Sequence, residues 1–210
     1  MRDDEYTYDP PTEADDAAST VMTETDARRG TDRAKEAEPS FLRWVAELVL
    51  MVGLAFLLAT AIRTFVVQPY VIPTGSMIPT IELWDRVVAN KFIYRFSDPE
   101  PGDIIVLDDP TASVPTLIKR VIAVGGQTVD LVDGKVVVDG VTLDEPYTYG
   151  KPSLPQSMSM PYVIPEDSVW VMGDNRTDSQ DSRYFGAVSL DDVRGKAIFR
   201  FWPIDRIGGL

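Results

Sequence analysis

A long apolar segment occupies residues 44–62 and reads WVAELVLMVGLAFLLATAI, with Glu47 as its only charged residue. As a helix, these 19 residues would span roughly 28 Å, close to the ~30 Å hydrocarbon core of a bilayer. A helix buried in a globular core would normally show a polar face, and none follows Glu47. The pattern therefore predicts one transmembrane anchor over residues 44–67, with Arg63 extending its side chain to the polar surface.

The residues on the two sides of this anchor differ in charge. Residues 1–43 contain 12 acidic and 6 basic residues and few large apolar ones, so we expect an acidic disordered tail there. Only Arg63 lies within about 20 residues after the apolar run 44–62, whereas five cations precede the run: Arg28, Arg29, Arg33, Lys35 and Arg43. The positive-inside rule predicts a single pass through the plasma membrane, with a cytoplasmic N-terminus and residues 68–210 outside. We expect the anchor to stay uncleaved, because no small-x-small site clearly follows it.

After Pro69 the pattern changes to short alternating runs rich in β-branched residues, separated by turn pairs such as Asp133-Gly134. Strands are expected at Arg86–Lys91, Asp103–Leu107, Leu117–Val124, Thr128–Val132, Lys135–Val138, Ser168–Met172 and Lys196–Trp202. Short strands at this spacing, with no long helix between them, predict a mainly β fold. We expect an antiparallel, barrel-like β domain over residues 68–210, behind one N-terminal transmembrane helix.

The chain contains neither histidine nor cysteine, and this restricts its chemistry. Without histidine it has no Ser-His-Asp triad and no imidazole metal site, and without cysteine it has no disulfide and no thiolate. We therefore expect no metal and no cofactor. The net charge of −13 argues against nucleic acid as the main partner, because phosphate contacts need lysine and arginine.

Ser76 lies in the sequence PTGSMIPT, shortly after the anchor. In this chain a serine nucleophile would need a lysine or a carboxylate as its base. Lys119 lies in TLIKRVIAVGG, where strand alternation places it on one face with Leu117, Val121 and Ala123. If that face is buried, the pKa of Lys119 falls and its neutral amine becomes a competent general base. An ordinary loop serine and a lysine reaching solvent from an edge strand are the alternative interpretations.

The densest polar cluster reads GDNRTDSQDSRYFG, residues 173–186, and follows an expected apolar strand. A calcium loop is excluded by its register, because Arg176 would occupy the third ligand position and no glycine stands at the sixth. The mixture of aspartate and arginine favours a hydrogen-bonded ion-pair cluster over a solvated loop. Such a cluster could orient a lysine, and Arg120, which stays protonated, is expected to form a fixed ion pair.

Together these segments resemble the type I signal peptidases, which are membrane-anchored Ser/Lys endopeptidases. The resemblance covers about residues 44–206. The matching blocks follow the family's order behind the anchor: Ser76-Met77-Ile78-Pro79-Thr80, then Lys119-Arg120-Val121 with Gly125-Gly126, then Gly173-Asp174-Asn175-Arg176 with Ser179, Asp181-Ser182-Arg183 and Gly186. The resemblance implies a membrane-bound serine endopeptidase that removes N-terminal signal peptides from exported precursors, cutting after small-x-small sequences.

The resemblance also implies roles for single residues. Ser76 would be the nucleophile and Lys119 the general base, and the Ser76 backbone N–H with the Thr74 hydroxyl would form the oxyanion hole. The lysine-orienting and structural residues would be Ser179, Asp181, Arg183, Asp174 and Arg120. The apolar substrate pocket, which would accept alanine and exclude bulkier side chains, would be formed by Tyr70, Ile72, Met77, Val87 and Ile118.

The expected partners are the signal peptides of exported precursors and the lipid bilayer, near the protein-export channel. The alternative function is a catalytically inactive or substrate-dedicated relative, for example one that serves pilins. A self-cleaving Ser/Lys repressor would need a DNA-binding domain, and none is visible. Two positions depart from the family pattern and affect expected turns: Trp84 stands at a usual glycine, and Gln127 at a usual aspartate.

Overall fold

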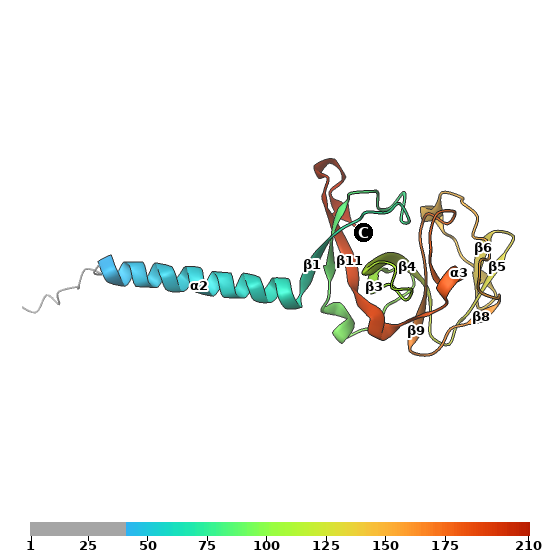
Figure 1. Cartoon of the computed structure of the whole chain (residues 1–210), viewed down its shortest axis with the longest axis horizontal. Coiled ribbons are helices and arrows are strands. Elements are labelled where there is room, and N and C mark those ends of the chain that lie inside the picture. The colour runs from blue at the N-terminus through green and yellow to red at the C-terminus, as the bar shows by residue number, and fades with distance from the viewer. Residues whose placement is uncertain (1–40) are drawn as a thin grey trace, which may run out of the picture. The chain divides into compact units, whose positions relative to one another are not determined.

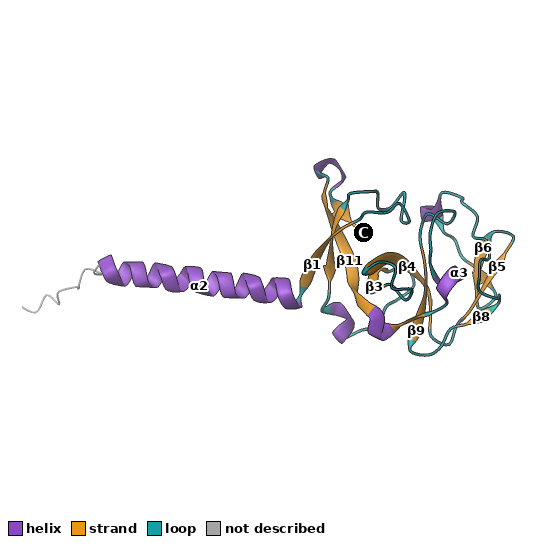
Figure 2. Ribbon diagram, in the orientation of Figure 1, coloured by secondary structure: helices purple, strands orange, loops and turns teal. Residues whose placement is uncertain are grey.

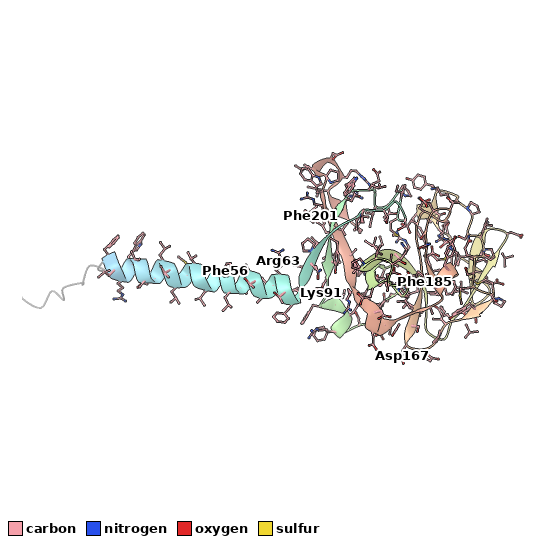
Figure 3. The ribbon with its side chains drawn as sticks, viewed as in Figure 1. Phe56, Arg63, Lys91, Asp167, Phe185 and Phe201 are labelled. Atoms are coloured by element: carbon pink, nitrogen blue, oxygen red, sulfur yellow. The ribbon has the colours of Figure 1, made fainter. Side chains whose placement is uncertain are left out.

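The computed structural model describes residues 41–210 (Figure 1). The acidic tail predicted for residues 1–43 therefore lies outside the described residues, apart from its last three. Those three residues are helical, because helix α2 runs from Phe41 to Phe65. Among the described residues, α2 is the one helix long and apolar enough to cross a membrane. None of its side chains is buried, and Figure 3 shows them, Phe56 among them, projecting outward.

The C-terminal limit of the predicted anchor is wrong, because α2 ends at Phe65 and Val67 begins a strand. Gln68 precedes Pro69, and the residue before a proline is disfavoured in helical conformation. Val67 instead pairs with Asn90 in an antiparallel ladder.

A curled antiparallel sheet forms the larger part of the β domain, as Figures 1 and 2 show. Each strand pairs antiparallel with its neighbours, and the strands at the centre of the sheet are the most buried. In spatial order the strands are β1 (Val67–Val71), β2 (Arg86–Asn90), β11 (Val193–Trp202), β3 (Ile104–Asp108), β4 (Thr116–Val124), β9 (Ser168–Met172) and β10 (Val188–Ser189), with β12 (Gly208–Gly209) paired to β11.

A smaller antiparallel sheet is inserted between β4 and β9. Its spatial order is β7 (Val141–Thr142), β6 (Lys135–Val138), β5 (Thr128–Val132) and β8 (Tyr162–Val163). Short helices fill the connections: η1 (Ile93–Arg95), η2 (Pro146–Thr148), α3 (Ser182–Phe185), η3 (Leu190–Asp192) and η4 (Ile204–Arg206). The mainly β, antiparallel, barrel-like fold predicted from the short alternating runs is confirmed, with the larger sheet curled into a half-barrel.

The seven expected strands all occur; three have the expected bounds, and the other four have ends that shift by one to three residues. Five further strands were not expected, and four of them are only two residues long, too short to show alternation. The fifth, β1, contains Pro69, which argues against a central strand. Pro69 is tolerated because β1 lies at the edge of the sheet and pairs only with β2.

Three clusters of buried apolar side chains form the core, and β4 contributes to each of them. Ile118 lies in the first cluster, Ile122 and Ala123 in the second, and Val121 in the third. The expectation that Ala123 shares a face with Val121 is wrong, because the β4–β9 ladder shifts register between these two residues. Such a bulge reverses the alternation beyond it. Lys119 lies before the bulge, so its side of the strand is as expected.

The two departures from the family pattern are accommodated without loss of the turns. Trp84 adopts a left-handed backbone with φ of 67° and remains 67% exposed, while the next residue, Asp85, is buried. Gln127 accepts a hydrogen bond from the Val124 N–H at 3.0 Å and donates one to Asp139 at 3.0 Å. A side-chain amide thus closes this turn.

Candidate active site

Ser76 lies in the loop between β1 and β2, and the apolar residues that follow it fix this loop to the sheet. Met77 and Ile81 are fully buried in the first core cluster. The backbone closes locally, since the Ile81 N–H donates to the Met77 carbonyl at 2.9 Å and the Ile78 N–H to the Gly75 carbonyl at 3.2 Å. Ser76 itself is only 7% exposed. A buried methionine directly after the serine therefore sets where the hydroxyl lies.

Lys119 reaches this hydroxyl from the middle of β4. The side chain is buried, and its Nζ donates a hydrogen bond to Ser76 Oγ at 2.7 Å. Burial lowers the pKa of Lys119 from 10.5 to about 8. Nearby charges act more weakly: Asp181, Asp109 and Asp174 raise the pKa, and Arg183 lowers it. Near neutral pH a useful fraction of this lysine is consequently a free amine.

The two side chains together have the chemistry of an activated nucleophile. A neutral amine in direct contact with a hydroxyl can take its proton as the oxygen attacks an electrophile. Lys119 is the one residue in the described part of the chain whose side chain hydrogen-bonds Ser76 Oγ. The alternatives of a plain loop serine and a solvated edge lysine do not match this burial and contact.

Ser179 does not make the hydrogen bond expected of a lysine-orienting residue. Its Oγ is buried and has no hydrogen-bond partner among the described residues. It lies close to the serine loop all the same: a Cβ at Gly173 would be 2.3 Å from Ser179 Oγ and 2.4 Å from the Ser76 carbonyl oxygen. Gly173 is thus needed for this close approach, and an orienting role for Ser179 remains a prediction.

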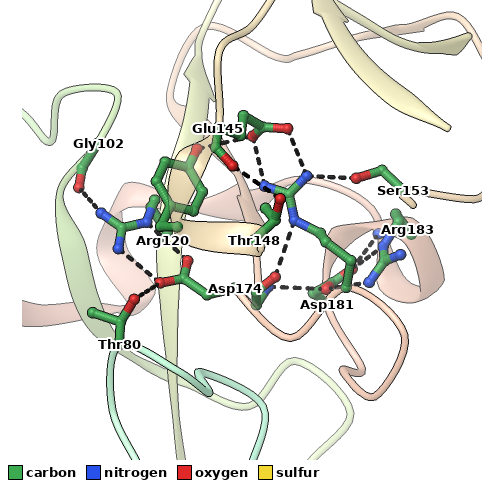
Figure 4. A network of polar contacts seen from close by, with 12 residues as sticks. Thr80, Gly102, Arg120, Glu145, Thr148, Ser153, Asp174, Asp181 and Arg183 are labelled. Carbon is green, nitrogen blue, oxygen red and sulfur yellow. Dashed lines mark hydrogen bonds and ion pairs between the residues drawn. The ribbon is translucent and has the colours of Figure 1, made fainter. Parts of the chain in front are cut away.

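A cluster of buried ion pairs lies beside the Ser76–Lys119 pair (Figure 4). Arg120 Nε and Nη2 donate to the two oxygens of Asp174 at 2.8 and 2.7 Å. Asp174 also accepts a 2.5 Å hydrogen bond from the Thr80 hydroxyl, which ties the far end of the serine loop to the cluster. These bonds match the expected fixed ion pair of Arg120, and they fix the geometry around the serine.

Asp181 and Arg183 form a second bidentate pair, with Arg183 Nε and Nη2 each 2.8 Å from a carboxylate oxygen. Asp181 begins helix α3 as its N-cap and also accepts the Gly173 N–H at 3.0 Å. Figure 4 shows Asp181 and Arg183 facing each other on one side of the cluster. The pair links α3 to the strand end that approaches the serine loop.

Two clefts border this site, and Lys119 lines both of them. The larger, of about 350 Å³, is lined by Ser76, Lys119, Thr74, Ser179 and the segment 177–180, among others. The other, of about 240 Å³, is mostly apolar and is lined by residues 70–74, Val106 and residues 114–119. Thr74 is exposed and lines both, and its role as an oxyanion donor stays a prediction.

The expected pocket residues are divided between this apolar cleft and the core. Tyr70, Ile72 and Ile118 line the cleft, as expected of a substrate pocket. Met77 and Val87 do not line it: both are 0% exposed, whereas Ile72 and Ile118, which belong to the same core cluster, also reach the wall of the cleft. Their assignment to the pocket is therefore corrected: they support the cleft from behind.

Two residues near the site had no role in the sequence interpretation. Asp109 lines the larger cleft and accepts hydrogen bonds from Thr111, Ser113 and Val114 in its own loop. Hydrogen bonds from that loop hold the pKa of Asp109 below its ordinary value, although burial opposes this. An aspartate followed at the second position by threonine is a turn signal that could have indicated this loop. The second residue, Asn175, contacts the serine loop directly.

Comparison with known proteins identifies the family to which the chain belongs. Residues 45–202 match the family described as signal peptidase, peptidase S26. The chain is 39% identical to signal peptidase I of Leptolyngbya laminosa, over 86% of this chain and 93% of the relative. It is 34% identical to signal peptidase I of Mycobacterium tuberculosis, strain H37Rv, over 92% and 84%. It is 33% identical to the probable thylakoidal processing peptidase 2 of Arabidopsis thaliana, over 70% and 41%. The chain therefore belongs to the signal peptidase family, peptidase S26, as an endopeptidase of the signal peptidase I type.

Proposed function

We propose that Ser76 and Lys119 carry the signal-peptide cleavage that characterises this family. The observation that supports this assignment is the 2.7 Å contact between Ser76 Oγ and a buried lysine whose pKa is lowered to about 8. Ser76 Oγ attacks the carbonyl carbon of the scissile bond while Lys119 Nζ takes the hydroxyl proton. The tetrahedral intermediate then collapses, the C–N bond breaks, and the lysine ammonium protonates the leaving amine. Water, deprotonated by Lys119, finally hydrolyses the acyl-serine ester.

The oxyanion of the intermediate is bound by the Ser76 N–H and the Thr74 hydroxyl. A donor of this kind is worth about 2.7–4 kcal/mol in the transition state. Thr74 is available for this role because it faces both clefts. The roles of Ser76, Lys119 and Thr74 are thereby distinct: attack, proton transfer and charge stabilisation.

The precursor binds as an extended strand along the apolar cleft. The cleft runs between residues 70–74 and residues 114–119, and both segments can offer backbone groups to a peptide that adds to the sheet. Tyr70, Ile72 and Ile118 leave shallow apolar space, which accepts alanine and excludes larger side chains. This accounts for cutting after small-x-small sequences.

The catalytic domain lies on the outer side of the plasma membrane, near the export channel, with α2 as a single-pass anchor. The support is the excess of cations before the helix, since positive charges stay in the cytoplasm. Because the chain contains no cysteine, single cysteines at Ser19 and Ser157 would report the topology in intact cells. A membrane-impermeant maleimide is expected to label only the second, and labelling of only the first would reverse the orientation.

The experiment that tests the active site is cleavage of a precursor by the full chain in detergent. Ser76→Ala is expected to abolish cleavage while leaving the melting temperature within a few degrees. Ser157→Ala is the matched control, because Ser157 is exposed and is also followed by a methionine. Full activity of Ser76→Ala would exclude this nucleophile.

The same assay tests the base through its pH dependence. Only the neutral amine of Lys119 accepts a proton, so kcat/KM is expected to rise tenfold per pH unit below about 8 and to level off above it. A rise seen only near pH 10 or above would mean that the lysine is not buried in the working enzyme. The alternative of an inactive relative is not favoured, since the named relatives are signal peptidases.

A further inference from the structure

Asn175 contacts the serine loop at two successive peptide groups. Its side-chain Nδ2 donates to the Gly75 carbonyl at 2.9 Å, and its backbone N–H donates to the Ser76 carbonyl at 3.0 Å. Asn175 is 6% exposed, so water does not readily replace these bonds. The contact joins the end of β9 to the catalytic loop across a hundred residues of sequence.

The first of these bonds bears on the oxyanion hole. The Gly75 carbonyl and the Ser76 N–H belong to one planar peptide group, and in a trans peptide they point in opposite directions. The Gly75 carbonyl also accepts the Ile78 N–H at 3.2 Å, and Asn175 supplies a second and shorter bond, so the two donors together fix the direction of the Ser76 N–H. The second bond holds the peptide group between Ser76 and Met77, so Asn175 contacts the peptide groups on both sides of the Ser76 Cα.

Lys151 determines which end of the Asn175 amide faces the loop. An ammonium group has only donors, and Lys151 Nζ lies 2.5 Å from Asn175 Oδ1. With the oxygen held by this cation, the NH₂ group faces the Gly75 carbonyl. The reversed amide would place its oxygen against that carbonyl and its NH₂ against the ammonium, which is unfavourable at both ends.

Lys151 is itself held in place by the neighbour of Asn175. The Arg176 guanidinium donates to both oxygens of Glu145 at 2.7 and 2.6 Å and to Ser153 Oγ at 2.5 Å. Arg176 and Ser153 are both buried, which fixes the segment 145–153 that carries Lys151. Arg176 thus holds the segment 145–153 in place, and Lys151 of that segment contacts Asn175, the residue before Arg176.

We propose that Asn175 and Lys151 are positioning residues for signal-peptide cleavage. Lys151 selects the orientation of the Asn175 amide, and Asn175 sets the plane of the peptide whose N–H binds the oxyanion. The proposal rests on the oxyanion role given above to Ser76. Because the oxyanion forms only in the transition state, the loss of either residue lowers kcat much more than it raises KM.

The test compares variants of the full chain in detergent on one precursor. Lys151→Met keeps the length of the side chain but has no donor, and kcat is expected to fall about tenfold, part of the 10²–10³ that an oxyanion donor contributes. KM is expected to stay within twofold, and the rise of kcat/KM to stay near pH 8. Lys151→Arg restores a donor and most of the rate. Lys135→Met is the matched control, since Lys135 is an exposed lysine at the start of β6 and has no hydrogen bond or ion pair with the serine loop among the described residues.

A double variant tests the order of action. Asn175→Ala is expected to lower kcat about a hundredfold, and adding Lys151→Met should change it no further, because the lysine acts through the asparagine. Asn175→Asp keeps a partner for Lys151 but has no donor for Gly75, so it is expected to be as slow as Asn175→Ala. If Lys151→Met fails to fold, the kcat of Asn175→Asp still tests whether the donor to Gly75 is needed.

Three outcomes would overturn the proposal: wild-type kcat in Lys151→Met, fully additive losses in the double variant, or a shift of the pH dependence, which would mean that Lys151 acts on Lys119. If the wild-type chain cleaves no precursor, the proposed function fails instead. The positioning role can then still be judged by NMR. The amide resonance of Ser76 should move in Lys151→Met and not in Lys135→Met, and an unmoved resonance would exclude it.

Discussion

Lys119 and Arg120 are neighbours on one strand, and the structure uses their positive charges in opposite ways. Lys119 points to an apolar side of β4, where its Nζ hydrogen-bonds only a hydroxyl, and burial lowers its pKa to about 8. Arg120 points to the other side, where Asp174 binds it with two hydrogen bonds and the Tyr147 ring lies 4.1 Å from its guanidinium. A buried amine without a carboxylate partner can lose its proton and act as a base, whereas a guanidinium stays protonated and its carboxylate partner fixes its position.

The ion pairs also protect the low pKa of Lys119. Asp181 is the charge that raises this pKa most, yet both of its oxygens are bound by Arg183, whose own field lowers the pKa. Asp174 is bound by Arg120 in the same way. The two arginines thus keep nearby carboxylates from pairing with the lysine, and the ion-pair cluster and the base depend on each other.

The largest predicted effect comes from removing the partner of Arg120. Asp174→Ala leaves the Arg120 guanidinium, whose side chain is 12% exposed, without its carboxylate partner and also releases the Thr80 hydroxyl, so the free energy of unfolding is expected to fall by about 3–5 kcal/mol. Urea unfolding of the full chain in detergent measures this, with Asp144→Ala, at an exposed carboxylate, as the control that should stay within about 0.5 kcal/mol. A loss below about 1 kcal/mol would show that Arg120 finds solvent or another partner.

A gain in stability, in place of a loss, is predicted when Lys119 is replaced. Lys119→Met is expected to abolish cleavage and to stabilise the chain at pH 7 by up to about 3 kcal/mol, from the fall in pKa between 10.5 and about 8. In the wild-type chain Lys119 binds its proton more weakly in the folded state than in the unfolded state, so the charged lysine destabilises the fold to the full extent below pH 8. This destabilisation disappears as the pH rises from about 8 to 10.5.

The matched measurement is the unfolding free energy of both chains across that pH range. The advantage of Lys119→Met should shrink steadily and be lost near pH 10.5. A variant less stable than wild type at pH 7, or an advantage independent of pH, would argue that Lys119 carries no buried charge in the folded state.

Much of this arrangement could be predicted from sequence, and the failures have physical causes. The long apolar run and the alternating strands gave the anchor and the sheet, because these periodicities follow from one buried side. Lys119 was found because its strand neighbours are apolar. The bulge after Val121 could not be seen, since it depends on how β4 pairs with β9. Met77 and Val87 were misplaced because a sequence does not distinguish an apolar cleft wall from the core behind it.

The smallest predicted effect tests whether a lysine at position 120 would have a lowered pKa, as Lys119 does. In Arg120→Lys the new ammonium still faces Asp174 but loses the bidentate geometry and the contact with the Gly102 carbonyl, so we expect a destabilisation of about 1–2 kcal/mol. The adjacent carboxylate favours the charged form, so the pKa of the new lysine should stay at or above about 10.4. NMR titration of the side chain measures this directly. If it titrated near 8, as Lys119 does, then burial alone and not the missing carboxylate would explain the base, and the contrast between the two neighbours would have to be given up.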